Sequence, residues 1–345
     1  MLLDKALTKQ QNRIHVVDYL RGFMALGIMV YHYLTWTYSP FDSSDFMGRV
    51  GIYGISTFYV LSGITLYYVY HKSLLFSNLK IFFIKRVFRI FPLMWLCIAL
   101  NVILFGQDYG WYKLFLNLTG LFGFVEPQNY IVTGAWSIGN ELVFYTLFPL
   151  VIFGARKFKF FAELFFILTL IIGLWFAFYL LPYESDLANK WTLYVNPFNQ
   201  AFLFFGGLLI AKWVKEYNNI VLGVVVSLVA LLVWIFYPAS GEQFHLHHQW
   251  NRIVFSLVCF VLAMGFLFMR GMKQNWLMST LGEISYSLYL VHPIVFWYIT
   301  KYINRIESPY TMLMVGFSIS FIISYLIYHF VETPFIKLGK KITSK

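Results

Sequence analysis

The chain has 345 residues, of which 60% are hydrophobic, 21% are aromatic and only 12% are charged. A soluble globular domain carries roughly 25% charged residues, and the chain has only two cysteines, so the composition excludes disordered, collagen-like and disulfide-rich secreted proteins. Apolar stretches close to the ~20 residues that cross ~30 Å of hydrocarbon recur along the whole chain. The sequence therefore predicts a polytopic membrane protein.

The apolar stretches predict an all-α bundle of about ten transmembrane helices. We expect a single domain over residues 1–345 without a fused soluble domain. An amphipathic piece at about 111–125 is too short and too interrupted by glycine to span, and is expected at the interface or dipping into the bundle. The ten predicted spans are at about 16–37, 50–70, 88–106, 136–155, 160–181, 197–213, 219–237, 252–269, 281–300 and 310–331.

The net charge of +11 is interpreted through the positions of the charges. Lysine and arginine are enriched in the cytoplasmic loops of membrane proteins. With a cytoplasmic N-terminus and ten spans, 20 of the 26 Lys and Arg residues fall on the cytoplasmic side. This asymmetry predicts that both termini are cytoplasmic. It also makes anionic lipid, and not nucleic acid, the expected partner of the basic surface.

Besides Asp18 at its cytoplasmic end, the first span contains the ionisable residues Arg21 and His32. Such residues cost roughly 2.5–3.5 kcal/mol on insertion scales, so they normally face a cavity and mark function. Eleven positions separate them, which puts both within about 20° of one helix face and roughly 16 Å apart along it. The alternative is an arginine that reaches the interface and a histidine that bridges helices in the core.

The fourth span opens with the run AWSIGNELVFY. Asn140 follows Trp136, and Tyr145 follows Glu141, by four residues, so each pair shares a helix face. The span enters from outside, which places Glu141 in the outer half at a depth similar to that of His32. We hypothesise that the two form a base and its orienting partner. The alternative is a carboxylate at the water interface.

Arg86 and Arg89 are three residues apart in the run KRVFRIFPLMW at the cytoplasmic entrance of the third span. Together with Lys85 they predict a compact cationic site suited to phosphates. The alternative is that these residues only set the orientation of the helix in the membrane.

The ninth span contains Ser285, Tyr289 and His292 on one face, and Pro293 loosens the helix there. Three further histidines, His245, His247 and His248, lie in the HLHH run at 245–248 in an outer loop. It lacks supporting carboxylates or cysteines, so we interpret it as a solvated loop and predict no metal site.

Six blocks occur in order along essentially the whole chain. They resemble the acyltransferase 3 family of integral membrane O-acyltransferases, many of which acetylate bacterial surface polysaccharides and lipopolysaccharide O-antigen. The blocks are YLRG with His32 beyond it, FYVLSG (58–63), KRVFRIFPLMW (85–95), AWSIGNELVFY (135–145), GEISYSLYLVHP (282–293) and VETP (331–334).

The resemblance implies roles for individual residues. The Arg/Lys-x10-His signature falls on Arg21 and His32, and the Trp-Ser-Leu-x-x-Glu block falls on 136–141 with Ile138 in place of Leu. We therefore expect catalytic, donor-binding and substrate-binding residues. The expected catalytic residues are His32 and Glu141. The expected donor-binding residues are Arg21, Arg86 and Arg89. The expected substrate-binding residues are Trp136, Tyr145, Tyr289 and His292.

The expected function is transfer of an acyl group from cytoplasmic acyl-CoA. We expect the donor to be acetyl-CoA rather than a CoA ester with a longer acyl chain. The expected acceptor is a hydroxyl of a cell-surface polysaccharide, an O-antigen or its lipid-linked precursor. The protein would then lie in the bacterial inner membrane, with acyl-CoA, a glycan and lipids as its partners. The alternatives are a transporter or flippase of a lipid-linked glycan, and an acyltransferase acting on a small molecule, peptide or lipid.

Overall fold

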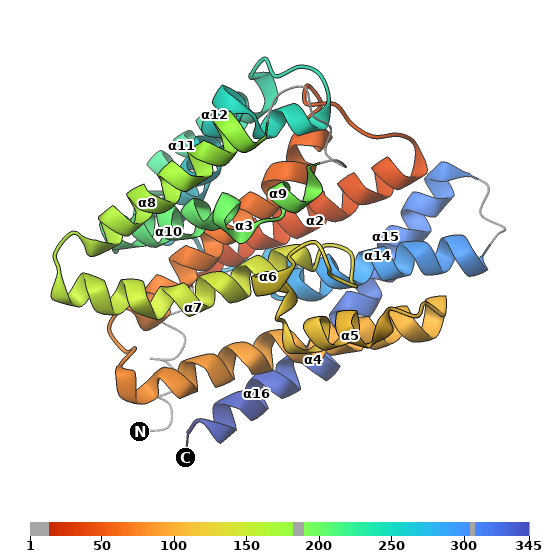
Figure 1. Cartoon of the computed structure of the whole chain (residues 1–345). Coiled ribbons are helices and arrows are strands. Elements are labelled where there is room, and N and C mark those ends of the chain that lie inside the picture. Colours follow the sequence, from red (N-terminus) through yellow and green to blue (C-terminus); the bar gives the residue numbers. More distant parts are fainter. Residues whose placement is uncertain (1–13, 182–189, 304–307, 345) are drawn as a thin grey trace.

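The computed structural model describes residues 14–181, 190–303 and 308–344. Within these ranges the chain is helical and has no β-strand, only a single bridge between Asp42 and Glu242. The long helices lie alongside one another in a bundle (Figure 1). The prediction of an all-α fold is confirmed.

The helices follow one another with short connections. The first half of the chain contains α2 (His15–Thr37), α3 (Phe46–Tyr70), η1 (Phe76–Asn78), α4 (Leu79–Phe105), α5 (Gly110–Thr119), α6 (Phe122–Val125) and α7 (Trp136–Lys157). The second half contains α8 (Phe161–Trp175), η2 (Phe176–Leu180), α9 (Trp191–Tyr194), α10 (Pro197–Val214), α11 (Ile220–Phe236), η3 (Gln243–His247), α12 (Gln249–Phe268), α13 (Trp276–Glu283), α14 (Ser285–Tyr302), α15 (Pro309–Ile327), η4 (Tyr328–Glu332) and α16 (Thr333–Ile342).

Seven helical stretches within the described ranges are long and apolar enough to cross a membrane. α2 and α14, which carry Arg21, His32 and His292, are not among them because polar side chains interrupt their apolar sequence. α11 is apolar but has only 17 residues. Each predicted span nevertheless overlaps a helix, so the count of ten crossings stays a prediction. The seven stretches are Phe46–Tyr70, Phe76–Phe105, Trp136–Lys157, Phe161–Leu180, Trp191–Val214, Gln249–Phe268 and Pro309–Ile342.

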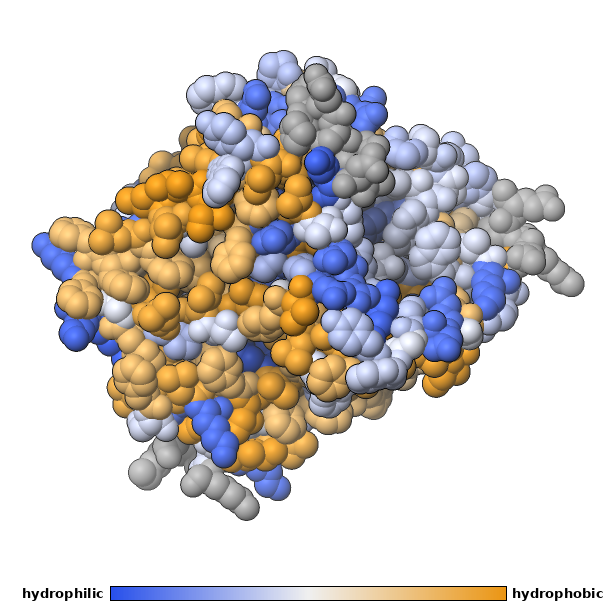
Figure 2. All heavy atoms as spheres, viewed as in Figure 1, coloured by the Kyte–Doolittle hydropathy of each residue, from blue (hydrophilic) through white to orange (hydrophobic). Residues whose placement is uncertain are grey.

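The outer surface of the bundle is apolar where a bilayer would cover it. Leu164 and Ile171 on α8 and Val221 on α11 are 64%, 58% and 75% exposed. Figure 2 shows apolar side chains gathered over α7 and α8, with hydrophilic residues at the end where these two helices meet. Exposed aliphatic side chains of this density are stable against lipid and not against water.

The two described ends of the chain lie at the same end of the bundle. Ile14 and Val17 border one cavity together with Ile336 and Lys340 of α16. An even number of crossings puts both ends on one side, as ten would. The cytoplasmic location of that side rests on the distribution of basic residues and stays a prediction.

Close backbone contacts hold α2, α3, α10 and α13 in place around the site. A Cβ added to Gly63 would lie 1.9 Å from the carbonyl oxygen of Phe204 on α10, and one added to Gly282 would lie 2.3 Å from that of Asp18 on α2. Small residues at such crossings let helices approach closely in a membrane. The predicted span at 281–300 is divided there, because α13 ends at Glu283 and α14 starts at Ser285.

The HLHH run differs from its prediction. Phe244 and Leu246 are buried, and His247 and His248 are only 1% and 2% exposed. The Tyr53 hydroxyl donates to the carbonyl oxygen of Leu246 at 2.5 Å. The interpretation as a solvated loop is therefore wrong, because alternate apolar residues turn the segment into the bundle. Burial, together with the neighbouring His245, lowers the pKa of His248 to about 4.

Candidate active site

A cavity of about 180 Å³ lies among α2, α3, α4, α7 and α14. A second cavity, of about 490 Å³, shares Arg21, Thr65, Arg89 and Ser285 with the first and continues toward the chain ends. The two form one recess that enters the bundle from the end where the termini lie. The polar side chains lining the first cavity are Arg21, Ser62, Thr65, Arg86, Arg89, Ser137, Glu141, Tyr145, Ser285 and Tyr289, with Tyr59, Tyr70 and Tyr286.

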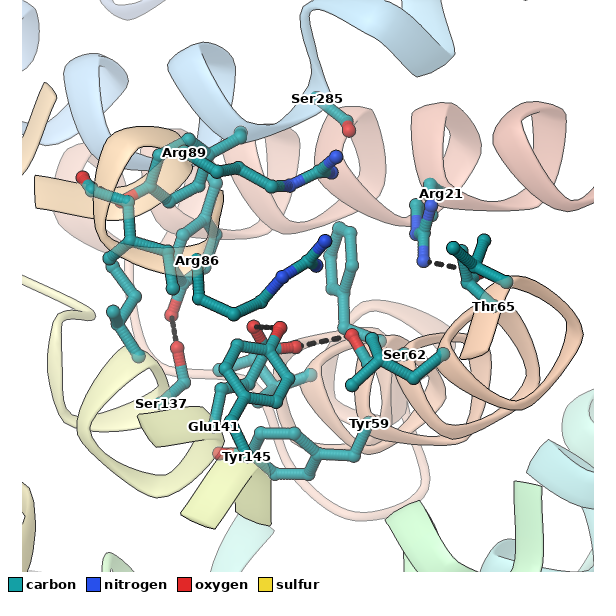
Figure 3. Close-up of a pocket in the computed structure, with 18 of the residues that line it drawn as sticks. Arg21, Tyr59, Ser62, Thr65, Arg86, Arg89, Ser137, Glu141, Tyr145 and Ser285 are labelled. Atoms are coloured by element: carbon teal, nitrogen blue, oxygen red, sulfur yellow. Dashed lines mark hydrogen bonds between the residues drawn. The ribbon is translucent and has the colours of Figure 1, made fainter. Parts of the chain in front are cut away.

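Three arginines, predicted from two separate parts of the sequence, meet at this cavity. Figure 3 shows the side chains of Arg21, Arg86 and Arg89 directed into the space between the helices. Arg21 donates to the Thr65 hydroxyl at 2.7 Å and to the carbonyl oxygen of Leu61 at 3.2 Å, and pairs with Asp18 at 3.4 Å. Arg21 is therefore held in place by protein groups.

Arg86 and Arg89 are less engaged than Arg21. Arg86 donates from Nη2 to the Tyr70 hydroxyl at 3.2 Å, and its buried Nε has no partner. Its guanidinium carbon lies 5.8 Å from the ring centroid of Tyr145. Among the described residues, neither arginine forms a salt bridge and Arg89 forms no hydrogen bond. Both retain donors for an anion. Lys85, predicted with them, lines neither cavity.

Glu141 lies with the arginines, and the predicted partnership with His32 is wrong. Its carboxylate accepts hydrogen bonds from the Ser62 hydroxyl and, at 2.6 Å, from the Tyr145 hydroxyl (Figure 3). Tyr145 is one helical turn further along α7, so this bond follows directly from the predicted spacing. The partner from α3, Ser62, lay in the quoted FYVLSG block but was given no role.

His32 instead contacts His292, which α14 contributes. Nδ1 of His32 lies 2.8 Å from Nε2 of His292. The His32 ring also stacks on Trp36, with 4.7 Å between centroids and 3° between planes. His292 is fully buried, whereas His32 is partly exposed. The two residues, predicted for different roles, form one histidine pair between α2 and α14.

Tyr289 separates the cavity from the histidine pair. It lines the cavity, and its ring centroid is 6.4 Å from that of His292. The Tyr289 hydroxyl donates to the carbonyl oxygen of Gly134 at 2.9 Å and lies 3.0 Å from the Ser137 hydroxyl. Gly134 has φ +83°, and a Cβ there would lie 2.7 Å from the tyrosine oxygen. Glycine is required for both reasons.

Trp136 does not line the cavity. Its ring packs on Tyr194 and Trp191 at centroid distances of 5.1 and 6.0 Å. Glu141 follows five residues later on α7, which is a rotation of about 140° away from Trp136. A substrate contact for Trp136 is therefore unsupported, whereas Tyr145 and Tyr289 do line the cavity.

Comparison with known proteins places the chain among acyltransferases. The model of an acyltransferase domain family matches residues 14–329. O-acetyltransferase OatA of Staphylococcus aureus (strain NCTC 8325 / PS 47) is 24% identical over 94% of this chain and 57% of its own length. SACOL0978 of S. aureus (strain COL), provisionally named an O-acetyltransferase, is 23% identical over 98% of this chain and 60% of its own length.

A shorter relative matches over most of both chains. ORF330 of Acidianus two-tailed virus, provisionally named an acetyltransferase, is 27% identical over 84% of this chain and 85% of its own length. The chain spans less than two thirds of the length of the two staphylococcal relatives. No solved structure matches. Since the family model covers nearly all of the chain, this protein belongs to the acyltransferase 3 family.

Proposed function

We propose that this protein is a membrane O-acetyltransferase that uses acetyl-CoA as donor and a glycan hydroxyl on the far side of the membrane as acceptor. The observation that carries the proposal is one continuous recess with three guanidinium groups near its mouth and a histidine pair beyond its inner wall. The host membrane would be the bacterial inner membrane. Staphylococcal OatA, named as an O-acetyltransferase, supports the reaction class.

The donor would bind through its phosphates. Coenzyme A carries several negative charges, and Arg86 and Arg89 have unused donors that line the recess. Guanidinium groups suit phosphate because their donors are arranged in a planar fork. Arg21, already bonded to Thr65, would contribute charge more than new hydrogen bonds. The long pantetheine arm would then extend along α2 toward the outer half.

The thioester would reach His32 past Tyr289. This side chain forms the wall between the cavity and the histidine pair. The separation of Arg21 and His32 along α2, roughly 16 Å, is a length that the pantetheine arm can cover. The glycan acceptor would approach His32 from the opposite side, where the partly exposed Trp36 stacks on the His32 ring.

His32 would act as general base. Its imidazole takes the proton of the acceptor hydroxyl while that oxygen attacks the thioester carbonyl carbon. The C–O bond forms, the C–S bond breaks, and the CoA sulfur leaves with the proton that His32 accepted. The products are an O-acetyl ester and free CoA. Glu141 takes no part in this proton transfer and instead positions Ser62 and Tyr145 at the donor cavity.

The test uses membranes that contain the protein, acetyl-labelled acetyl-CoA and host glycan. We expect base-labile label in the glycan fraction together with release of free CoA, and at least a ~100-fold loss of both in His32→Ala. The matched control is His71→Ala, which we expect to retain activity. His71 directly follows the last residue of α3, at the end of that helix away from the loop that connects it to α2. If the label appears in the lipid, peptide or small-molecule fraction instead, the acceptor is a molecule of that class and not a glycan. Absence of both label and CoA release would contradict the proposal and favour a transporter.

A further inference from the structure

We infer that His292 is a positioning residue that fixes the tautomer of His32, so that Nε2 of His32 is the basic atom of the site. The inference rests on the proposed function for its catalytic meaning, but its structural content stands on a chain of hydrogen bonds. That chain runs from the carbonyl oxygen of Leu288 through His292 to His32.

The first step concerns the proton on His292. Nδ1 of His292 lies 2.8 Å from the carbonyl oxygen of Leu288, one turn earlier on α14. A carbonyl oxygen only accepts hydrogen bonds. Nδ1 of His292 must therefore carry a proton and donate it to this bond. In a neutral imidazole with a protonated Nδ1, Nε2 has no proton and is an acceptor.

The second step establishes that His292 is neutral. It is fully buried, and within the described part of the chain neither His292 nor His32 has a hydrogen-bonded carboxylate partner. A buried imidazolium without a counter-charge is strongly disfavoured. Glu141, the carboxylate that the sequence analysis expected beside His32, instead accepts hydrogen bonds from the hydroxyls of Ser62 and Tyr145.

The third step follows for His32. Since Nε2 of His292 is an acceptor, Nδ1 of His32, at 2.8 Å, must be the donor. The proton of neutral His32 is then on Nδ1, and the lone pair is on Nε2. Stacking on Trp36 at 4.7 Å and 3° fixes the plane of the ring. His32 is also the member of the pair that is partly exposed, so its Nε2 is the atom that an acceptor can reach.

This arrangement does what an orienting carboxylate does in a serine hydrolase triad, without placing a charge in the membrane. The second ring and a backbone carbonyl select the tautomer, and the Nδ1–H of His32 continues to donate when Nε2 takes the acceptor's proton. Hydrogen bonds in such a chain also polarise one another in a medium of low dielectric.

The experiment measures the tautomer directly. The full-length protein, labelled with ¹⁵N-histidine and purified in detergent, is examined by long-range ¹H–¹⁵N correlations, which distinguish protonated from unprotonated ring nitrogens. The signals of His32 are identified by their disappearance in His32→Gln. We expect His32 to be protonated at Nδ1 in the wild type, and still at Nδ1 in His292→Gln, whose side-chain oxygen can accept the same bond. In His292→Leu we expect a shift to Nε2.

The matched control is His71→Leu. His71 makes the same kind of bond as His292, from Nδ1 to the carbonyl oxygen one turn earlier, at 2.8 Å to Tyr67. It lies at the end of α3 and does not contact His32. We expect its removal to leave the His32 signals unchanged. A wild-type His32 protonated at Nε2, or a His292→Leu variant that keeps the Nδ1 proton, would overturn the inference.

Activity gives the second readout. We expect His292→Leu to lower kcat by about 10²–10⁴-fold, as loss of the correct tautomer does in other enzymes, with KM for acetyl-CoA changed less than ~2-fold. His292→Gln should retain at least a tenth of the activity, since it restores the acceptor. If His292 had only a structural role, the activity of both variants would fall together with their thermal stability. If the wild type shows the Nδ1 tautomer but transfers no acetyl group, the proposed function fails and the assignment of the tautomer stands.

Discussion

Arg49 on α3 and the Arg86–Arg89 pair on α4 hold their guanidinium groups in opposite ways: Arg49 is buried, whereas Arg86 is partly exposed and Arg89 is exposed. Arg49 on α3 is 2% exposed, and its guanidinium donates to the carbonyl oxygens of Ser43, Trp234, Ile235 and Tyr237 at 2.5–2.9 Å. It lines neither of the two cavities described above. The Arg86–Arg89 pair lines the cavity of the candidate active site and forms a single hydrogen bond among the described residues.

The difference shows how to distinguish a structural arginine from a binding arginine in a membrane bundle. Arg49 caps the last turn of α11, where carbonyl groups have no helical partner and carry partial negative charge. Its donors are used by the protein itself. At the cavity, Nε of Arg86 is buried without a partner, a costly state unless a ligand completes it. Unused donors at a cavity therefore indicate function better than burial does.

The largest effect is expected at Arg49. Arg49→Leu removes four hydrogen bonds and leaves buried carbonyl groups unsatisfied, at a cost of about 1–3 kcal/mol for each such group. We expect loss of folded protein, measured as yield and as Tm in detergent by nanoscale fluorimetry. A variant that keeps the wild-type Tm would contradict the structural role assigned to Arg49.

A smaller and more specific effect is expected at Arg89. Arg89→Gln should raise KM for acetyl-CoA by about 10-fold, the size of one charge-assisted hydrogen bond to phosphate, with Tm unchanged. The rise should shrink at high salt, where screening weakens the wild-type interaction. Steady-state kinetics on Lys85→Gln is the matched control, because Lys85 is on the same helix and lines neither cavity. Equal effects of both variants would refute a specific phosphate site.

The smallest effect concerns pH and the buried His248 of the HLHH run. Burial lowers the pKa of His248 to about 4, below the usual value of 6.5. A neutral histidine is therefore favoured in the folded state, and its contribution to stability is fully present above pH 6.5 and declines as the pH falls toward 4. We expect Tm to fall by a few degrees over this window. His248→Gln should remove most of this dependence. His245→Gln, at a partly exposed position in the same segment, should keep most of it, because burial is the larger cause of the lowered pKa of His248 and His245 the smaller one.

Much of the fold was predictable because helices in a membrane follow directly from apolar length. The ten predicted ranges overlap helices, and periodicity correctly put Glu141 beside Tyr145 on α7. The division near Ser285 and the π-helical turns of η2 and η4 were not predicted, since they depend on close packing between helices.

Most of the side chains at the site could be predicted, although Trp136 does not line the cavity and Ser62 was given no role. The pairing of these side chains could not be predicted. Periodicity assigns a residue to a face and a depth of its own helix, but the neighbouring helix is set by packing. His32 was expected beside Glu141, yet it meets His292 because α14 lies against α2, while Ser62 of α3 reaches Glu141. The HLHH run was misjudged since burial of its histidines depends on Tyr53 and other side chains distant in sequence.

The central claim is that the donor binds in the recess, whereas proton transfer takes place at the histidine pair beyond the wall that Tyr289 forms. The measurement that tests it most directly is equilibrium binding of labelled acetyl-CoA, made in parallel with transfer assays, on wild type, His32→Ala and Arg89→Gln. The account predicts that His32→Ala binds the donor like the wild type and transfers nothing, whereas Arg89→Gln binds about 10-fold more weakly and transfers at saturating donor. Loss of donor binding in His32→Ala, or wild-type binding in Arg89→Gln, would contradict it.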